Sequence, residues 1–440
     1  MRRLEKISLV MGFVFLLSQV FGGMLRYYLA SLGMAPLVYL PKVLLTVALL
    51  GAALVSPARK RVSRLFLLVL ALTLVFSLVG YVFVRNLLQV AFGLWVMLPF
   101  FYGVFFLPSI LRVWPRLRPH LLLLWGSAAV GVIINVFYEF PWVGFAYSLG
   151  ELEIEASRAW VAQGLGLSRV PGFSGASFEA AAQILLLGLA LTFMMSRRWR
   201  IPVWIVSGVA IALTTSKTPL GIWFFLTFLF VLGWFIPMRF FRFLPVFLVL
   251  IGIALPLSSV YGSYDPRADS IVSRFLFASF EDRLEWVWPT SLHMVVEHGS
   301  LLLGRGIGGI GSPQQYFEPF LYSPADSLAV YLFGLGGVFG LLILAAYGII
   351  ASLIPLYTHQ NRFFFFLILA VLLEGWTVNV MESPLFAMAF GLSLRYGWDI
   401  LERQAVFSGK KMASTAVCFP SQAGEVESGS HEGTERSIQK

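Results

Sequence analysis

The stretch LFLLVLALTLVFSLVGYVFV, residues 65–84, decides the fold class of this chain. It runs for 20 residues without a charged side chain and follows a basic segment that ends at Arg64. About 20 apolar residues in a helix span the roughly 30 Å of hydrocarbon in a bilayer, because each residue adds about 1.5 Å. Residues 65–84 are therefore predicted to form a transmembrane helix.

Apolar runs of this kind recur along most of the chain. Hydrophobic residues make up 58% of the 440 residues and charged residues only 12%, with a mean hydropathy of +0.83. Soluble proteins carry about 25% charged residues. We therefore expect an all-α, polytopic membrane protein with about twelve transmembrane helices. The expected helices lie near 7–25, 36–56, 65–84, 87–111, 120–140, 177–196, 201–215, 219–238, 244–260, 327–354, 363–381 and 384–400.

Two features qualify this reading of the runs. The run at 201–215 is short, which leaves open that it forms one broken hairpin with its neighbour around Ser216. The first apolar run lacks a small-residue cleavage site, so we expect it to remain as a helix.

Basic residues occupy every second connecting segment. This alternation follows the positive-inside rule and predicts that both termini are cytoplasmic. It also explains the net charge of +10 better than nucleic-acid binding does. The basic segments carry Arg2, Arg3 and Lys6; Arg59, Lys60, Arg61 and Arg64; Arg112, Arg116 and Arg118; Arg197, Arg198 and Arg200; Arg239 and Arg242; and, more weakly, His359 and Arg362.

The predicted organisation is one membrane domain and a tail. Residues 1–402 form the transmembrane domain, with outer segments at 141–176 and 261–326, the second long enough for a small helical subdomain. Residues 403–440 are rich in Ser, Gly, Glu and Lys, a composition typical of disorder, and are predicted to be a disordered cytoplasmic tail.

The sequence argues against metal, disulfide and nucleotide sites. One cysteine, Cys418, excludes a disulfide framework, and the five scattered histidines show no metal-binding spacing. The stretch LGRGIGGIG (303–311) is neither a Walker A motif nor a dinucleotide fingerprint, so a backbone turn is favoured there. We expect no cofactor and no metal.

Arginines in the outer segments run against the positive-inside rule and need an explanation. The planar guanidinium suits phosphate, which it binds by paired, charge-assisted hydrogen bonds. The alternative is that each arginine pairs with a nearby carboxylate. Arg169 stands out because Pro171, Gly172 and Gly175 bend the chain beside it; it either holds a phosphate group or reaches up to lipid headgroups.

Four stretches within about 165–345 together resemble a known family. They are RVPGFSGASFEAA (169–181), ALTTSKTPLG (212–221), EDRLEWVW with LLLGRGIGGIG (within 281–311) and ADSLAVYLFGLGGVFG (325–340). In order, spacing and sidedness the chain resembles the O-antigen ligase and polymerase family. These are polytopic membrane glycosyltransferases that act outside the cytoplasmic membrane on polyprenyl-pyrophosphate-linked glycans.

The resemblance implies a GT-C-like fold in the bacterial inner membrane, with the active site outside. In the ligase branch the last motif begins with a His-Asn pair, whereas this chain has Asp326 and Ser327. We therefore expect a polymerase of lipid-linked repeat units, with the ligase reaction as an alternative. The expected partners are the lipid-linked oligosaccharide and membrane lipid, with a chain-length regulator and a flippase possible. A transporter is the alternative from another class.

The resemblance also assigns residues. Arg169, Arg274, Arg305 and Lys217, which stands where the family has arginine, are expected to bind the pyrophosphate. The expected catalytic residues are Arg283, Asp326 as the base and Glu285 as the second choice of base. Asp326 precedes a predicted helix, so an N-cap role is an equal alternative.

Glu374, in AVLLEGWTV (370–378), is predicted to lie near the middle of a membrane helix. A carboxylate at that depth is a functional candidate by default, since its burial is costly unless it is paired. It could line a proton pathway, but a structural pair with Arg26 or Lys42 is the favoured reading.

Overall fold

The computed structural model describes residues 3–55, 64–149, 152–161, 168–261 and 279–416. This part is helical apart from one two-stranded hairpin, so the all-α class holds here with that exception. The α-helices are α1 (Arg3–Val20), α2 (Gly22–Ser31), α3 (Leu40–Val55), α4 (Arg64–Val84), α5 (Leu87–Val96), α6 (Leu98–Phe137), α7 (Ser177–Met194), α8 (Arg197–Leu213), α9 (Lys217–Leu232), α10 (Leu244–Tyr261), α12 (Trp288–His298), α13 (Ser312–Phe317), α14 (Leu328–Ser352), α15 (His359–Glu374) and α16 (Pro384–Ala416). The shorter elements are η1 (Ala35–Tyr39), η2 (Met238–Phe243), the π-turn η3 (Arg283–Val287), η4 (Pro319–Leu321), β1 (Ala146–Leu149) and β2 (Leu152–Glu155).

Six helical segments are long and apolar enough to cross a membrane, as judged over the described residues. They are Ala35–Ala52, Arg64–Val84, Leu98–Phe137, Ser177–Met194, Met238–Tyr261 and Leu328–Ser352. The number rises to seven if α1 and α2, which meet at an angle of 84°, count as one broken span. The other expected runs also form helices, but these are shorter or more polar.

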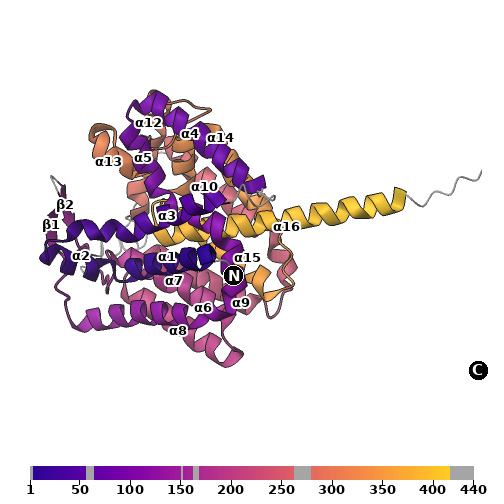
Figure 1. Ribbon diagram of the computed structural model, residues 1–440, viewed down its shortest axis with the longest axis horizontal. Helices are drawn as coiled ribbons and strands as arrows, with labels where there is room; N and C mark the ends of the chain where they lie inside the picture. The colour runs from indigo at the N-terminus through magenta and orange to yellow at the C-terminus, as the bar shows by residue number, and fades with distance from the viewer. Residues whose placement is uncertain (1–2, 56–63, 150–151, 162–167, 262–278, 417–440) are drawn as a thin grey trace, which may run out of the picture. The chain divides into compact units, whose positions relative to one another are not determined.

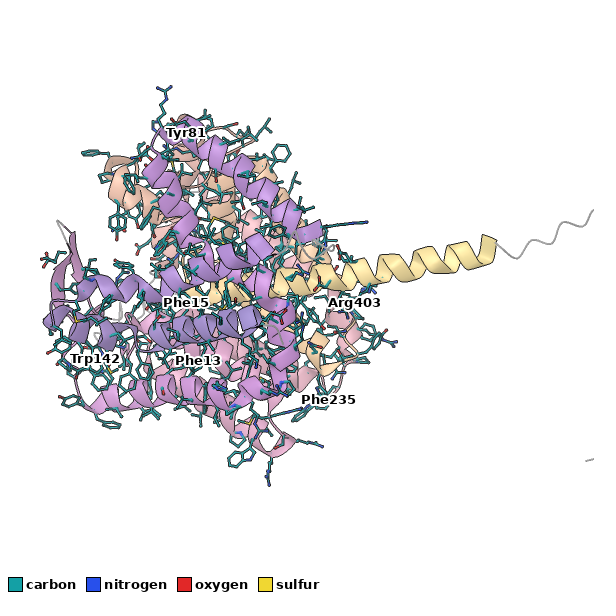
Figure 2. All side chains as sticks on the ribbon, viewed as in Figure 1. Phe13, Phe15, Tyr81, Trp142, Phe235 and Arg403 are labelled. Carbon is teal, nitrogen blue, oxygen red and sulfur yellow. The ribbon has the colours of Figure 1, made fainter. Side chains whose placement is uncertain are left out.

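Large apolar side chains cover the outer surface of several of these helices (Figure 2). On α4, Leu78 is 67% exposed, and on α10 Leu250 is 60% exposed. Water would penalise such surfaces, whereas lipid tails solvate them. The architecture is therefore consistent with a helical membrane protein.

Helix α6 departs from the expected pattern. The runs 87–111 and 120–140 were expected to be separate spans joined by a basic loop. Instead, α5 is short, and α6 continues for 40 residues through Arg112, Arg116 and Arg118. Three prolines lie inside α6 without ending it, and such breaks in the hydrogen-bond ladder are tolerated when neighbouring helices pack around them. Part of the expected basic loop is thus helical. Arg112 forms an ion pair with α1, in which its Nη1 lies 2.8 Å from Glu5 Oε2.

Helix α7 forms the centre of one group of packed helices. Most of its side chains are buried, and it packs against α6, α8, α9 and α15 (Figure 1). Helix α10 packs against α14 and α15, and α14 contains a non-helical break at Gly337. Because α7, α9, α14 and α15 all begin or end near one region, their termini carry the site described below.

The two outer segments fold differently from each other. The first, 141–176, contains the antiparallel hairpin of β1 and β2, which sequence patterning did not predict. The described part of the second consists of η3, α12, α13 and η4, in agreement with a helical segment.

The C-terminal part of the chain forms its own unit. One compact unit covers Met1–Asp399, and the second covers Ile400–Lys440. Helix α16 continues to Ala416, past residue 403 where the disordered tail was expected to begin. The remainder of that tail, 417–440, lies outside the described residues.

Candidate functional site at the turn after helix α15

The turn that follows α15 brings three of the four motif stretches together. The backbone carbonyl of Gly375 accepts hydrogen bonds from Leu328 N at 2.7 Å and Ser327 Oγ at 3.2 Å, at the start of α14. Two residues on, the Thr377 carbonyl accepts a bond from Arg283 Nε at 3.0 Å. The Thr377 hydroxyl bonds that of Thr218, at the start of α9, at 2.8 Å.

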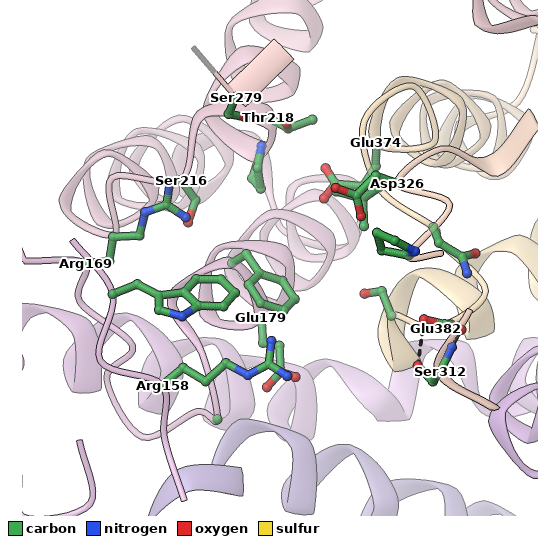
Figure 3. Close-up of a pocket in the computed structure, with 18 of the residues that line it drawn as sticks. Arg158, Arg169, Glu179, Ser216, Thr218, Ser279, Ser312, Asp326, Glu374 and Glu382 are labelled. Atoms are coloured by element: carbon green, nitrogen blue, oxygen red, sulfur yellow. Dashed lines mark hydrogen bonds between the residues drawn. The ribbon is translucent and has the colours of Figure 1, made fainter. Parts of the chain in front are cut away.

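A cavity of about 420 Å³ lies beside this turn. Arg169, Lys217, Arg283 and Asp326 line it, and so does Glu374. Figure 3 shows Asp326 and Glu374 on one side of the cavity, across from Arg169 and Ser216. An adjoining cavity is also lined by Arg169, Arg283 and Asp326. Arg169, which is expected to bind the pyrophosphate, and Arg283, which is expected to be catalytic, therefore share one hollow.

Arg169 is held at this cavity by Trp160. Its backbone N–H donates to the Trp160 carbonyl at 2.7 Å, and its guanidinium lies 5.8 Å from the centre of the Trp160 ring. The Nε of Arg169 is buried and has no hydrogen-bond partner among the described residues. Burial lowers the pKa of Arg169, and the nearby charge of Arg283 lowers it further. The guanidinium is thus a cation that is short of negative partners.

The bend beside Arg169 depends on glycine, as the sequence indicated. Gly172 has a φ of 62°, in the left-handed region, and a Cβ there would lie 2.8 Å from Val132 N in α6. Its carbonyl accepts a bond from Trp142 Nε1 at 2.8 Å. A residue larger than glycine would be strained here and would also push α6 away. The bend at Gly172 therefore fixes the backbone position from which the Arg169 side chain extends.

Arg283 and Asp326 form an ion pair, with Arg283 Nη2 3.0 Å from Asp326 Oδ2. The other nitrogens of Arg283 donate to the Thr377 carbonyl and to the carbonyl and hydroxyl of Ser279. Burial raises the pKa of Asp326, although Arg283 opposes this rise. The N-cap position of α14 is held by Ser327, so the alternative role of Asp326 as the cap is not seen.

The backbone at Asp326 is unusual for a non-glycine residue. Ala325 has a φ of 62° and Asp326 a φ of 23°. Such conformations cost of order 1–3 kcal/mol and cluster at functional sites. At Ala325 and Asp326 these conformations accompany a turn in which the Asp326 carboxylate pairs with Arg283 instead of capping the N-terminus of α14.

Lys217 lies at the start of α9, before the apolar run that begins at 219. It lines the same cavity as Arg169. Burial lowers its pKa, and the charges of Arg169 and Arg283 add to the effect. Three cations therefore act on one another around a single hollow.

The structure corrects the expectation for Arg305. Its side chain is only 2% exposed, does not line the cavity, and pairs with Glu318 at 3.0 Å. It also donates to the carbonyls of His298 and Gly309. Arg305 therefore holds a loop together and is not placed to bind a substrate.

Of the two remaining predicted residues, Glu285 is in the described part of the chain and is not brought to the cavity. Glu285 lies on η3 with its side chain exposed, and it lines neither cavity. A base at that position would have no enclosed substrate to act on, so the structure does not support that role. Arg274 lies outside the described residues.

The glycine-rich stretch 303–311 forms backbone turns, as favoured from the sequence, and these turns pack against α4 and α14. Ile307 N donates to the Phe76 carbonyl of α4 at 2.9 Å, and Gly306 N donates to the Leu335 carbonyl of α14 at 3.1 Å. A Cβ on Gly306 would lie 2.0 Å from Gly80 N. Arg305 N also donates to the Gly334 carbonyl of α14 at 2.7 Å, so three amides of the stretch are used by helix carbonyls instead of cradling a phosphate.

Several lining residues were missed by sequence reasoning. Glu382 accepts hydrogen bonds from Ser312 N at 2.6 Å and Ser312 Oγ at 2.8 Å (Figure 3). Burial raises the pKa of Glu382 to about 6, while the Ser312 hydrogen bonds oppose the rise. Its only sequence signal is a carboxylate between two apolar runs. The other missed residues, which include Arg26, Arg158, Trp160, Glu179 and Tyr322, also line the cavity.

Comparison with protein-family models, with curated proteins and with solved structures finds no match to this chain. Among the described residues, no group of three or more His, Cys, Asp or Glu side chains is gathered as metal ligands would be. What the site can do follows from its geometry: five cations and four carboxylates line a hollow large enough for a charged ligand, and three of the cations, Arg169, Lys217 and Arg283, act on one another.

Proposed function

We propose that this chain is a membrane glycosyltransferase that joins lipid-linked oligosaccharide repeat units into a polysaccharide, with polyprenyl pyrophosphate as the leaving group. The observation that carries the proposal is Arg169, whose buried Nε has no hydrogen-bond partner among the described residues. A buried donor without a partner costs about 1–3 kcal/mol. A diphosphate would remove this cost and would also neutralise the mutual repulsion of Arg169, Lys217 and Arg283.

The reaction follows from the distribution of charge. A hydroxyl of the acceptor glycan attacks the anomeric carbon of the donor, and the bond from that carbon to the diphosphate oxygen breaks. The electron pair leaves with the diphosphate, where negative charge grows. Preorganised cations at this point lower the barrier most, which is the role of Arg169 and Lys217. Asp326 keeps Arg283 in place through their ion pair.

The proposal includes a finer architecture and location. In this proposal the protein has about twelve membrane-spanning segments in a GT-C-like arrangement. It lies in the bacterial inner membrane, with segments 141–176 and 261–326 outside. The placement of both outer segments on the same side is supported by the cavity, because Trp160 and Arg169 come from the first outer segment and Arg283 and Asp326 from the second. A flippase and a chain-length regulator are the expected partners.

The test is a reconstitution with purified protein and a polyprenyl-pyrophosphate-linked oligosaccharide. The expected result is a ladder of longer lipid-linked products that forms without added nucleotide. Transfer only to a different lipid acceptor would instead support the ligase reaction. Movement of the substrate across vesicles without a new glycosidic bond would overturn the proposal in favour of transport.

A further inference from the structure

The proposed reaction releases a proton from the acceptor hydroxyl, and four carboxylates line the cavity where it is released: Glu179, Asp326, Glu374 and Glu382. Both oxygens of Glu382 already accept hydrogen bonds from Ser312. Asp326, the choice from sequence, is already engaged: its Oδ2 lies 3.0 Å from Arg283 Nη2. Arg283 is in turn fixed by bonds to Ser279 and Thr377. Protonating Asp326 would therefore break the ion pair that holds Arg283 in position.

Glu374 is another of these carboxylates, and its surroundings differ from those of Asp326 and Glu382. It is the last residue of α15, its side chain is 2% exposed, and it lines the cavity. Its Oε2 is buried without a hydrogen-bond partner among the described residues. The favoured structural pairs with Arg26 or Lys42 are not found there. A buried carboxylate oxygen without a partner is costly, and such a cost is retained where the group meets a ligand.

The backbone places Glu374 close to Asp326. Gly375, the next residue, accepts the hydrogen bond from Leu328 N, two residues after Asp326, at 2.7 Å. Figure 3 shows both carboxylates on the same side of the cavity. The other charged groups that line this hollow from neighbouring elements are Arg26, Arg158, Arg169, Lys217, Arg283, Glu179 and Glu382.

We propose that Glu374 is the catalytic base, whose free Oε2 accepts the proton of the attacking hydroxyl, while Asp326 is a positioning residue for Arg283. This inference rests on the proposed function and adds to it the residue that accepts the proton. As the new carbon–oxygen bond forms, the hydroxyl proton moves to Glu374, which becomes a neutral carboxylic acid. The electron pair of the broken bond leaves on the diphosphate, so charge and atoms balance without a further reactant.

The experiment compares wild-type protein with Glu374→Gln and Glu374→Asp in the reconstituted assay. Glutamine keeps the size of the side chain but cannot take up the proton, so the rate of polymer formation should fall about 10²–10⁴-fold. The KM for the lipid-linked substrate should stay within about twofold. Aspartate should restore part of the rate with a changed pH profile. The control is Glu297→Gln, an exposed carboxylate on α12 that lines neither cavity.

Thermal melting and gel filtration of each variant separate a folding defect from a catalytic one. If Glu374→Gln is folded and keeps the wild-type rate and pH profile, the inference is wrong while the polymerase proposal stands. A folded Glu374→Gln protein that fails to bind substrate would also contradict it, because a base acts after binding. If the wild-type protein makes no polymer, the proposed function fails and the role of Glu374 fails with it.

Discussion

Arg169 is the residue whose loss should reveal the diphosphate most directly. We expect Arg169→Ala to lower the rate of polymer formation about 10²–10³-fold, as for the loss of one transition-state donor. Arg169→Lys should fall between this variant and the wild type, because lysine restores the charge without the planar pair of donors. The measurement is kcat in the reconstituted assay, with Arg198→Ala as the control, since Arg198 is an exposed cation outside the cavity. Equal rates for Arg169→Ala and Arg198→Ala would contradict a phosphate role.

Single residues could be predicted from sequence only where a local pattern limits them. The sequence marked Arg169, because Pro171 and Gly172 bend the chain beside it, and the structure places it in the cavity. Arg305 looked equivalent, but it is buried against Glu318. Nothing in a linear pattern tells whether a guanidinium will meet a carboxylate 13 residues away or face a hollow. That choice depends on the packing of helices that are distant in sequence.

At the scale of elements, the contact of Glu382 with Ser312 ties the segment before α16 to the start of α13. Because burial raises the pKa of Glu382 to about 6 from 4.5, the folded state binds this proton more tightly than the unfolded state. The contribution of protonated Glu382 to the free energy of unfolding is therefore fully present below pH 4.5 and is lost as the pH rises through about 6. The loss amounts to about 2 kcal/mol.

The measurement for Glu382 is the melting temperature of the detergent-solubilised protein between pH 4 and pH 7. Relative to Glu382→Gln, the wild type should lose stability over the window from about 4.5 to 6. Ser312→Ala removes one hydrogen bond that lowers the pKa, so this variant should move the upper limit of the window to higher pH. Parallel melting curves for wild type and Glu382→Gln would show that the carboxylate titrates normally.

The helices themselves were the most predictable elements, because apolar runs of helix length leave few other structures in lipid. Their ends were less predictable. The run 7–25 is broken at Phe21 into α1 and α2, and α6 continues through a segment that its charges had marked as a loop. Hydropathy records which residues avoid water, whereas a helix end depends on hydrogen bonds and packing that no single run contains. For the same reason the hairpin of β1 and β2 was missed.

At the scale of the whole molecule, the distribution of charge predicts which side of the membrane carries the site. The basic segments alternate with two segments rich in carboxylates, and both of the latter contribute residues to the cavity. The positive-inside rule then predicts that the cavity lies outside and the basic segments inside. The charge pattern of the sequence predicts the side of the membrane, whereas the fold brings the two segments together at one cavity.

This sidedness is testable because the chain has one cysteine, Cys418, in its C-terminal segment. In a Cys418→Ser background, Gln315→Cys places a thiol at the cavity, and Trp199→Cys places one at the start of α8, where the side chain is 51% exposed. A small membrane-impermeant maleimide should label position 315 in intact cells but label position 199 only after the membrane is opened; in the unaltered chain, Cys418 should behave like position 199. Labelling of position 199 from outside, with position 315 protected, would invert the topology. A site facing the cytoplasm would then be incompatible with a reaction that starts from glycans already carried across the membrane.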